Sequence, residues 1–273
     1  MIHPARVAFH NGEIAPTGDL HVDPFGPLAL WGEGIFDTFR VHQGRILYGP
    51  LHVARLLSSV ESVWGLREDL RARVEETWRL VEREAQAFSS GRGRVVVAPV
   101  EASRQSFDVF AELDCWSAPS AEDYARGVSL GFSKQMHPGL GAWGKSTSAL
   151  WSRTAIDEAR KRSLDELILC RNEIIVETAW SAIIWREQGE DHWWTPSSSL
   201  GGLQSTTLEA LRASGVEIVD VVATRERIRY AQSIVLLSSL RLAIGVNSLG
   251  ERQYEALDRY AAPLREILLS APR

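Results

Sequence analysis

The pattern of hydrophobic and polar residues in the first part of the chain predicts two helices and several strands. Apolar residues recur at helical spacing over 51–65 and stop at Gly65, and a helix with one strongly charged face follows over 68–88. The run Ser-Ser-Gly-Arg-Gly at 89–93 is expected to break the chain. Alternating and Val-rich runs predict an Asn-Gly hairpin at 5–15, a strand-turn-strand at 35–48, and strands at 94–100 and 107–113.

A stretch of small residues with a proline, 116–122, separates two structured runs and predicts a domain boundary. We therefore expect a small N-terminal α+β domain over 1–115, a linker over 116–122 and a larger C-terminal domain over 123–273. In the C-terminal domain the pattern predicts helices at 146–163, 206–214, 224–231 and 252–269, and strands at 128–132, 166–170, 173–177, 182–186, 192–195, 216–222 and 233–238.

Composition narrows the class of protein. The 273 residues are 45% hydrophobic and 24% charged, which is ordinary for a globular chain, and the net charge of -5 argues against a nucleic-acid partner. The seven histidines form no metal-binding spacing, so no metal is expected. Cys115 and Cys170 are far apart and favour a reduced, cytoplasmic setting. The start of the chain has no signal-peptide pattern, and no apolar run approaches membrane-spanning length.

Lysine is rare in this chain, where most basic positions are arginine. The lysines are Lys134, Lys145 and Lys161, among 30 residues of lysine and arginine. Arginine stays protonated, whereas lysine can lose its proton and act as an amine nucleophile. Lys161 lies in Arg-Lys-Arg on a predicted helix and is expected to be solvated, and Lys134 is expected in a polar turn. Lys145 follows Gly-Ala-Trp-Gly and precedes Ser-Thr-Ser, so it is either the catalytic amine or a lysine at a helix start.

Two further features accompany this amine. Glu177 ends a predicted strand, and two candidate anion-binding elements are present: Arg55 in a helix and the glycines before helix 206–214. For Arg55 the alternative is a surface ion pair, and for the glycines it is an ordinary turn with a Ser/Thr cap. A Schiff-base amine, a carboxylate that keeps a pyridine nitrogen protonated and a phosphate-binding element are what pyridoxal phosphate needs.

The motifs extend over nearly the whole chain. They are Gly-Glu-Gly-Ile-Phe-Asp-Thr-Phe-Arg-Val at 32–41, His-Val-Ala-Arg-Leu at 52–56, His-Pro-Gly-Leu-Gly-Ala-Trp-Gly-Lys at 137–145, Val-Glu-Thr-Ala at 176–179, Gly-Leu-Gln at 202–204 and Ser-Ser at 238–239. On these motifs the chain resembles the class IV, fold-type-IV pyridoxal-phosphate enzymes. That family includes branched-chain and D-amino-acid aminotransferases and 4-amino-4-deoxychorismate lyase.

The resemblance implies a two-domain α+β fold like that of D-amino-acid aminotransferase, with pyridoxal 5'-phosphate in the interdomain cleft, and a homodimer. It also implies roles for individual residues. Lys145 would form the Schiff base and then move the substrate proton, Glu177 would pair with the ring nitrogen, and Arg55 would bind the phosphate. The remaining implied residues are Gly202, Leu203, Gln204 and Ser239 at the phosphate, Thr38 in catalysis, and Phe36 and Arg40 facing substrate.

The chain departs from the family pattern at several positions. Gln204 and Ser205 replace the phosphate-loop threonine and the basic residue after it, and Ala182 replaces an asparagine. Ser148 and Leu150 stand where an asparagine or tyrosine is usual. The strand at 94–100 ends Val-Ala-Pro-Val and lacks the arginine often found at that end. The missing strand arginine weakens a D-amino-acid assignment. A non-catalytic binding protein on the same fold is therefore one alternative.

The resemblance leaves two enzymatic functions open for a small amine or amino-acid substrate. The His-Pro-x-Leu approach to Lys145 and the sequence Phe36-Asp37-Thr38 favour the lyase, which converts aminodeoxychorismate to 4-aminobenzoate and pyruvate for folate synthesis. The other function is amino transfer to a keto acid, of the branched-chain or D-amino-acid type.

Overall fold

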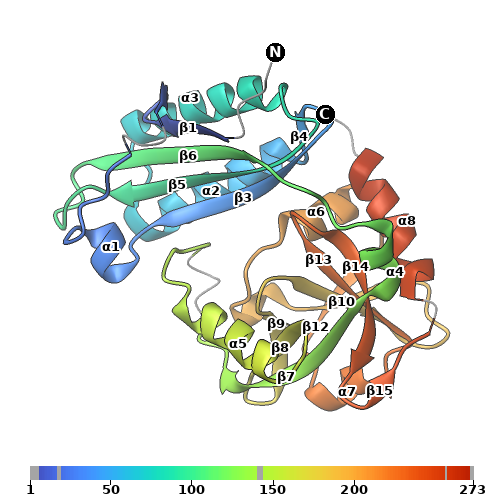
Figure 1. Cartoon of the computed structure of the whole chain (residues 1–273). Helices are drawn as coiled ribbons and strands as arrows, with labels where there is room; N and C mark the ends of the chain where they lie inside the picture. The colour runs from blue at the N-terminus through green and yellow to red at the C-terminus, as the bar shows by residue number, and fades with distance from the viewer. Residues whose placement is uncertain (1–5, 17–19, 140–143, 256, 271–273) are drawn as a thin grey trace. The chain divides into compact units, whose positions relative to one another are not determined.

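The computed structural model describes residues 6–16, 20–139, 144–255 and 257–270. It divides into two compact units (Figure 1). The N-terminal unit comprises the described residues of Met1–Ala118 and Trp143–Ala149, and the C-terminal unit those of Pro119–Ala142 and Leu150–Arg273. The segment that carries Lys145 therefore belongs to the N-terminal unit, although it comes after residues 116–122 in the sequence. The assignment of 116–122 as a linker stays a prediction.

The N-terminal unit is built on an antiparallel six-stranded sheet in the order β2-β1-β6-β5-β3-β4. Its elements are β1 (Arg6–His10), β2 (Glu13–Ala15), α1 (Pro27–Trp31), β3 (Ile35–His42), β4 (Arg45–Ile46), α2 (Gly49–Trp64), α3 (Glu68–Ala85), β5 (Ser90–Pro99) and β6 (Phe107–Cys115).

Helices α2 and α3 cover one face of this sheet (Figure 1). Their apolar residues at helical spacing meet the inward residues of the strands, and Phe39 of β3 packs edge-on against Trp78 of α3 with ring centroids 5.0 Å apart. Helix α2 ends at Gly65, whose φ of 74° is readily adopted by glycine alone, as the sequence predicts. The buried face of β3 is thereby fixed as the one that carries Phe39.

The C-terminal unit is built on a nine-stranded mixed sheet in the order β12-β11-β10-β13-β14-β7-β8-β9, with β15 paired to β14. Its elements are α4 (Ala121–Arg126), β7 (Val128–Met136), α5 (Leu150–Lys161), β8 (Glu166–Arg171), β9 (Ile174–Thr178), β10 (Ala182–Arg186), β11 (Trp193–Pro196), the 3₁₀ turn η2 (Ser198–Leu200), α6 (Thr206–Ala213), β12 (Ile218–Val221), α7 (Arg225–Arg229), β13 (Ser233–Ser238), β14 (Leu242–Leu249), β15 (Arg252–Gln253) and α8 (Leu257–Ser270).

The core of the C-terminal unit lies among its strands and includes the fully buried Trp185. Strands β8, β9, β10 and β13 are rich in Ile, Val and Leu, which is the composition expected for strands buried on both faces. Within the described residues, no helix is both long enough and apolar enough to cross a membrane. The predicted α+β class is confirmed by the two sheets and their helices.

Several predicted boundaries were wrong. Helix 146–163 begins only at Leu150, because residues 145–147 pair with the N-terminal sheet instead. The predicted helix 252–269 is a short strand at Arg252–Gln253 followed by α8. Lys134, expected in a turn, lies in β7. Strand β14 was not predicted, although four of its eight residues are Leu, Ile or Val.

The glycine-rich run at 89–93 was expected to break the chain, yet β5 begins at Ser90 and runs through it. Gly93 pairs with Phe39 of β3, and a Cβ placed on Gly93 would lie 2.2 Å from two ring atoms of Phe39. The glycine is therefore required by close packing of a phenylalanine ring, not by a turn.

We predict that Gly93→Ala lowers the free energy of unfolding by about 1–3 kcal/mol, because the methyl group overlaps the buried ring of Phe39. Urea unfolding followed by circular dichroism measures the change. The double variant Gly93→Ala with Phe39→Leu should recover part of the loss. A loss in the double variant equal to the sum of the losses in the two single variants would contradict the packing explanation.

Candidate active site

Strand β3 carries a buried carboxylate toward helix α2. Alternation along β3 places Asp37 on the same face as Phe39, where it is fully buried. A buried charge needs partners, and Arg55 donates from Nε to Oδ2 at 2.7 Å and from Nη2 to Oδ1 at 2.8 Å. His52 donates from Nδ1 to Oδ1 at 2.6 Å. The predicted phosphate-binding Arg55 is thus oriented by Asp37, and a phosphate contact would use the N–H groups that do not face this carboxylate.

The same three side chains set the ionisation of the carboxyl group. Burial raises the pKa of Asp37, but the charges and hydrogen bonds of His52 and Arg55 outweigh it and leave the pKa well below the ordinary value of 3.8. Asp37 is therefore an anion that is held between two donors of α2. The surface ion pair considered for Arg55 is a buried, bidentate one, with Arg55 9% exposed.

Lys145 is held against the start of β3. The amide of Phe36 donates to the carbonyl of Lys145 at 2.8 Å, and the amide of Thr147 donates to the carbonyl of Gly34 at 2.7 Å. The half-buried side chain of Lys145 places its Nζ 5.1 Å from the centroid of the Phe36 ring. Lys145 is therefore not a helix-start lysine, since α5 begins only at Leu150.

Two close contacts explain the small residues around Lys145. Gly144 has a φ of 104°, and a Cβ on it would lie 2.4 Å from the Cβ of Ser59 on α2. Gly34 faces Thr147 at a similarly short distance, with a Cβ contact of 2.9 Å. Only glycine allows the chain to pass this close to α2 and β3. Residues 140–143 of the motif before Lys145 lie outside the described residues.

Arg94 of β5 joins this face of the sheet, and the sequence did not indicate it. It pairs directly with Thr38 in the β3–β5 register, and its Nε donates to the Thr38 hydroxyl at 3.2 Å. Its guanidinium carbon lies 5.1 Å from the centroid of the Phe36 ring, the ring that Lys145 also contacts. An amine, a hydroxyl and a guanidinium thus converge around Phe36.

Arg40, predicted to face substrate, is 6% exposed, and its guanidinium carbon lies 5.5 Å from the centroid of the Trp116 ring. The side chain is therefore much less accessible than Thr38 or Arg94. The alternation rule predicted one face for Phe36, Thr38 and Arg40, but Trp116 covers the last of them.

Glu177 lies on β9 in the C-terminal unit and is held by two donors. The buried His137 accepts a hydrogen bond at Nδ1 from the amide of Gly139 at 2.9 Å, which places a proton on Nε2. That Nε2 donates to Oε1 of Glu177 at 2.8 Å. The amide of Leu203 donates to Oε2 at 3.1 Å. The carboxylate is thus fixed in position, with lone pairs left on each oxygen for a further donor.

The predicted phosphate loop precedes helix α6. Gly201 has a φ of 84° and packs against the backbone of Gly139. The loop therefore lies beside the segment that begins at His137. Because the Leu203 amide faces Glu177, it takes no part in a phosphate cup in this arrangement. Gln204 is exposed and has a contact within the chain.

The start of α6 offers a second group of donors. The first turn of a helix leaves amide N–H groups without intrahelical acceptors, and these attract anions. The hydroxyl of Thr206 lies 3.5 Å from that of Ser239, the predicted phosphate ligand. The buried Thr207 hydroxyl has no hydrogen-bond partner among the described residues. These groups fit a phosphate better than the loop residues 202–204 do.

A buried ion pair connects the neighbours of Glu177 and Ser239. Glu166, 3% exposed, accepts from Arg241, two residues after Ser239, and from the hydroxyl of Thr178, which follows Glu177. Neither Glu166 nor Arg241 was singled out from the sequence. Their pairing fixes the end of β9 relative to the turn after β13.

Each unit, taken by itself, carries side chains of the kinds that pyridoxal phosphate requires. The N-terminal unit supplies an amine at Lys145 and a buried, oriented guanidinium at Arg55. The C-terminal unit supplies a fixed carboxylate at Glu177 and the donors of α6 and Ser239. The unsatisfied Thr207 hydroxyl at the same turn, with no partner in the described part of the chain, is consistent with a ligand there. The donor set therefore fits the cofactor.

Comparisons with known proteins identify the family and the fold. Residues 34–249 match the family Amino-transferase class IV. A fold IV-transaminase, CpuTA1, from Curtobacterium pusillum has a similar structure, with a TM-score of 0.83 and 19% identity over 98% of this chain and 100% of that one. No curated protein matches the chain in sequence.

Two further structures share the fold. A hypothetical aminotransferase from Mycobacterium tuberculosis in its PLP-bound form has a TM-score of 0.82 and 21% identity over 97% of this chain and 99% of that one. The branched-chain aminotransferase from the thermophilic archaeon Thermoproteus uzoniensis, with norvaline, has a TM-score of 0.78 and 20% identity over 96% and 94%. The match to the family covers most of the chain, and the chain belongs to the class IV aminotransferase family of pyridoxal-phosphate-dependent enzymes.

Proposed function

We propose that this enzyme is a 4-amino-4-deoxychorismate lyase, which splits aminodeoxychorismate into 4-aminobenzoate and pyruvate. The observation that carries the proposal is the hydroxyl of Thr38, held by Arg94 beside the ring that Lys145 contacts. In the proposed reaction a carbon–oxygen bond of the substrate breaks, and the leaving oxygen needs a proton. Amino transfer has no such leaving group and needs no second proton donor.

Lys145 is the proposed general base. Its amine removes the proton from the substrate ring carbon that bears the amino group. Pyridoxal phosphate, held by Arg55, Ser239 and Glu177, would supply the electron sink for that carbon. Thr38 gives its proton to the departing enol oxygen. The Arg94 guanidinium donates to the Thr38 oxygen and stabilises the negative charge that develops on it. The proton that Lys145 removed then returns to the Thr38 oxygen, so both side chains regain their starting protonation state. The enol becomes pyruvate, the ring becomes aromatic, and no water or oxidant is consumed.

Other side chains bind and orient. Arg55, held by Asp37, binds the cofactor phosphate together with the start of α6 and Ser239. Glu177 would accept a hydrogen bond from the protonated ring nitrogen of the cofactor, and His137 keeps the Glu177 carboxylate in place. A guanidinium beside Phe36 also suits a substrate that carries a carboxylate, which aminodeoxychorismate does.

The second candidate is an amino-acid aminotransferase of the branched-chain or D-amino-acid type. The transaminase structures that share the fold motivate it. Lys145 would then deliver the proton to a carbon of the cofactor, and Arg94 would bind the carboxylate of the amino acid. The two candidates differ in whether the Thr38 hydroxyl is needed.

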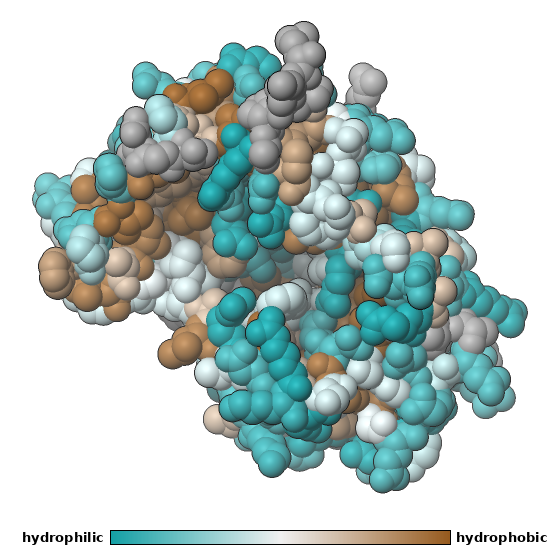
Figure 2. All heavy atoms as spheres, viewed as in Figure 1, coloured by the Kyte–Doolittle hydropathy of each residue, from teal (hydrophilic) through white to brown (hydrophobic). Residues whose placement is uncertain are grey.

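We also propose a homodimer. Figure 2 shows hydrophobic residues gathered on the side of the N-terminal unit that carries α1. Phe25, Leu30 and Trp31 in and before α1 are 79%, 51% and 56% exposed, which is unusual for large apolar side chains grouped within a few residues. A second copy of the chain would remove them from water.

We predict that Thr38→Val reduces the formation of 4-aminobenzoate and pyruvate from aminodeoxychorismate by about 10²-fold, because the proton donor is lost while the shape is kept. Thr38→Ser should retain most of the activity. Both products are measured by chromatography. If the protein forms neither product and instead transfers amines only when a keto acid is added, the lyase assignment is wrong.

We predict that Lys145→Ala abolishes turnover and the visible absorbance of the bound cofactor, since the amine that carries the cofactor is gone. Lys161→Ala, at the exposed end of α5, is the matched control and should behave like the wild type. Turnover that survives in Lys145→Ala would remove Lys145 from the mechanism.

We predict that Asp37→Asn lowers the free energy of unfolding by about 3–5 kcal/mol at neutral pH, because Arg55 loses its buried counter-charge. The pKa of Asp37 is depressed, so its contribution is complete above the ordinary value of 3.8 and is lost as pH falls below that value. Urea unfolding between pH 3 and pH 7 tests this.

The wild type should lose stability toward pH 3 more steeply than Asp37→Asn. Cofactor affinity should also fall in the variant, because Arg55 is no longer oriented. Asp191→Asn is a suitable control, since its side chain is fully exposed. Equal acid sensitivity of wild type and Asp37→Asn would show that Asp37 is not the responsible group.

A further inference from the structure

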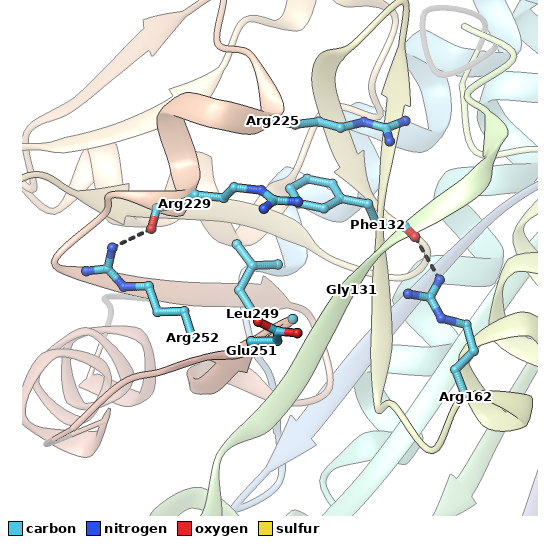
Figure 3. A pocket seen from close by; sticks show the side chains of 9 residues that line it. Gly131, Phe132, Arg162, Arg225, Arg229, Leu249, Glu251 and Arg252 are labelled. Atoms are coloured by element: carbon cyan, nitrogen blue, oxygen red, sulfur yellow. Dashed lines mark hydrogen bonds between the residues drawn. The ribbon is translucent and has the colours of Figure 1, made fainter.

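A strongly basic pocket lies in the C-terminal unit. It holds about 600 Å³ and is lined by Gly131, Phe132, Arg162, Arg225, Arg229, Leu249, Gly250, Glu251 and Arg252 (Figure 3). None of these residues belongs to the set assigned above to the cofactor or substrate. The volume is that of an ordinary small-molecule site.

Four arginines converge on this pocket in a protein whose net charge is -5. Arg225 and Arg229 are four residues apart in α7, so their side chains leave the same face of the helix. Their guanidinium carbons lie 5.3 Å and 5.5 Å from the centroid of the same ring, that of Phe132. Two like charges on one ring repel each other, and an anion beside them would offset the repulsion.

The carboxylates of the chain neutralise only some of this charge. Arg162 is paired with Glu158 at 2.8 Å, and Arg225 lies 3.4 Å from Glu173. In the described part of the chain, Arg229 and Arg252 have no carboxylate partner. Within the same residues, the guanidinium of Arg252 donates only to backbone carbonyls, those of Arg229 and Ala231.

The acidic charge in the pocket lining does not balance the charge of the four arginines. Glu251 is the single acidic residue among the nine that line the pocket. In Figure 3 the side chain of Arg229 reaches to the ring of Phe132, with Arg225 beside it, and Arg162 and Arg252 lie on opposite sides of the pocket. Guanidinium groups that stack by their faces on an aromatic ring keep their N–H edges available for an anion.

We propose that this pocket is a binding site for a small polyphosphate, a molecule with two or more linked phosphate groups. Each phosphate group offers several equivalent acceptor oxygens, so guanidinium groups that approach from different directions can share it. Linked phosphate groups carry more charge and more acceptor oxygens than a single phosphate, which suits a lining with four guanidinium groups. The half-buried Phe132 and the adjacent Gly250, with open space around it, leave room for the ligand.

The test is calorimetric titration of the cofactor-loaded enzyme, so that the cofactor's own phosphate site is filled. Pyrophosphate and tripolyphosphate should bind once per chain, at least about tenfold more tightly than orthophosphate or citrate. Binding should weaken steeply as salt rises from about 0.05 to 0.5 M. Absence of saturable binding, or equal affinity for citrate, would overturn the proposal.

Variants locate the site. Arg229→Gln should weaken tripolyphosphate binding at least about tenfold, and among the described residues its guanidinium makes no hydrogen bond that the substitution would break. The matched control is Arg227→Gln on the same helix, whose guanidinium faces Glu187 and Trp194 instead of the pocket. Equal losses in both variants would reduce the effect to general charge and refute a built site.

Arg252→Gln supplies a second, independent variant on β15. It should weaken tripolyphosphate binding by a factor similar to that of Arg229→Gln, and its circular dichroism spectrum should show that the fold is kept. Unchanged tripolyphosphate affinity in a folded Arg252→Gln variant would overturn the proposed site. Because lyase or transfer activity is not the readout, failure here leaves the proposed function untouched.

Discussion

The buried anion of Asp37 is the constraint on which the arrangement of the candidate site residues in the N-terminal unit depends. It lies on the inward face of β3, where an isolated charge is costly, and it is stabilised only because α2 brings two donors to it. This pairing fixes α2 against β3. It also fixes the outward face of the same strand, where Phe36 and Thr38 lie and where the backbone of Lys145 is hydrogen-bonded. One carboxylate thus positions a predicted phosphate ligand and the predicted reactive amine together.

In the C-terminal unit two carboxylates, those of Glu177 and Glu166, are likewise held by hydrogen-bond donors. Glu177 is fixed by His137 and by the Leu203 amide, and the strand end beside it is fixed by the Glu166–Arg241 pair. In both units a predicted functional side chain is oriented by a buried partner. Such support reduces the reorganisation that a reaction would otherwise require.

The sequence predicted the fold class, and it also proposed candidate functional residues, because glycine turns, helical periodicity and a rare lysine are local signals. The sequence did not predict features that depend on contacts between residues far apart in the chain. The run that contains Gly93 predicts a chain break, because nothing local shows that Phe39 of a neighbouring strand occupies its space. Alternation places Arg40 on the face of Phe36 and Thr38, but it does not show that Trp116 covers Arg40 or that Arg94 of the next strand joins this face. His137 lies 40 residues from Glu177 in sequence, so their hydrogen bond is visible only after folding.

The most direct test of the account is to find which lysine carries the cofactor. The purified enzyme loaded with pyridoxal phosphate is reduced with borohydride, digested and analysed by mass spectrometry. The account predicts a pyridoxyl group on the peptide that contains Lys145 and none on the peptides of Lys134 or Lys161. A label on either of those lysines, or no label at all, would contradict it.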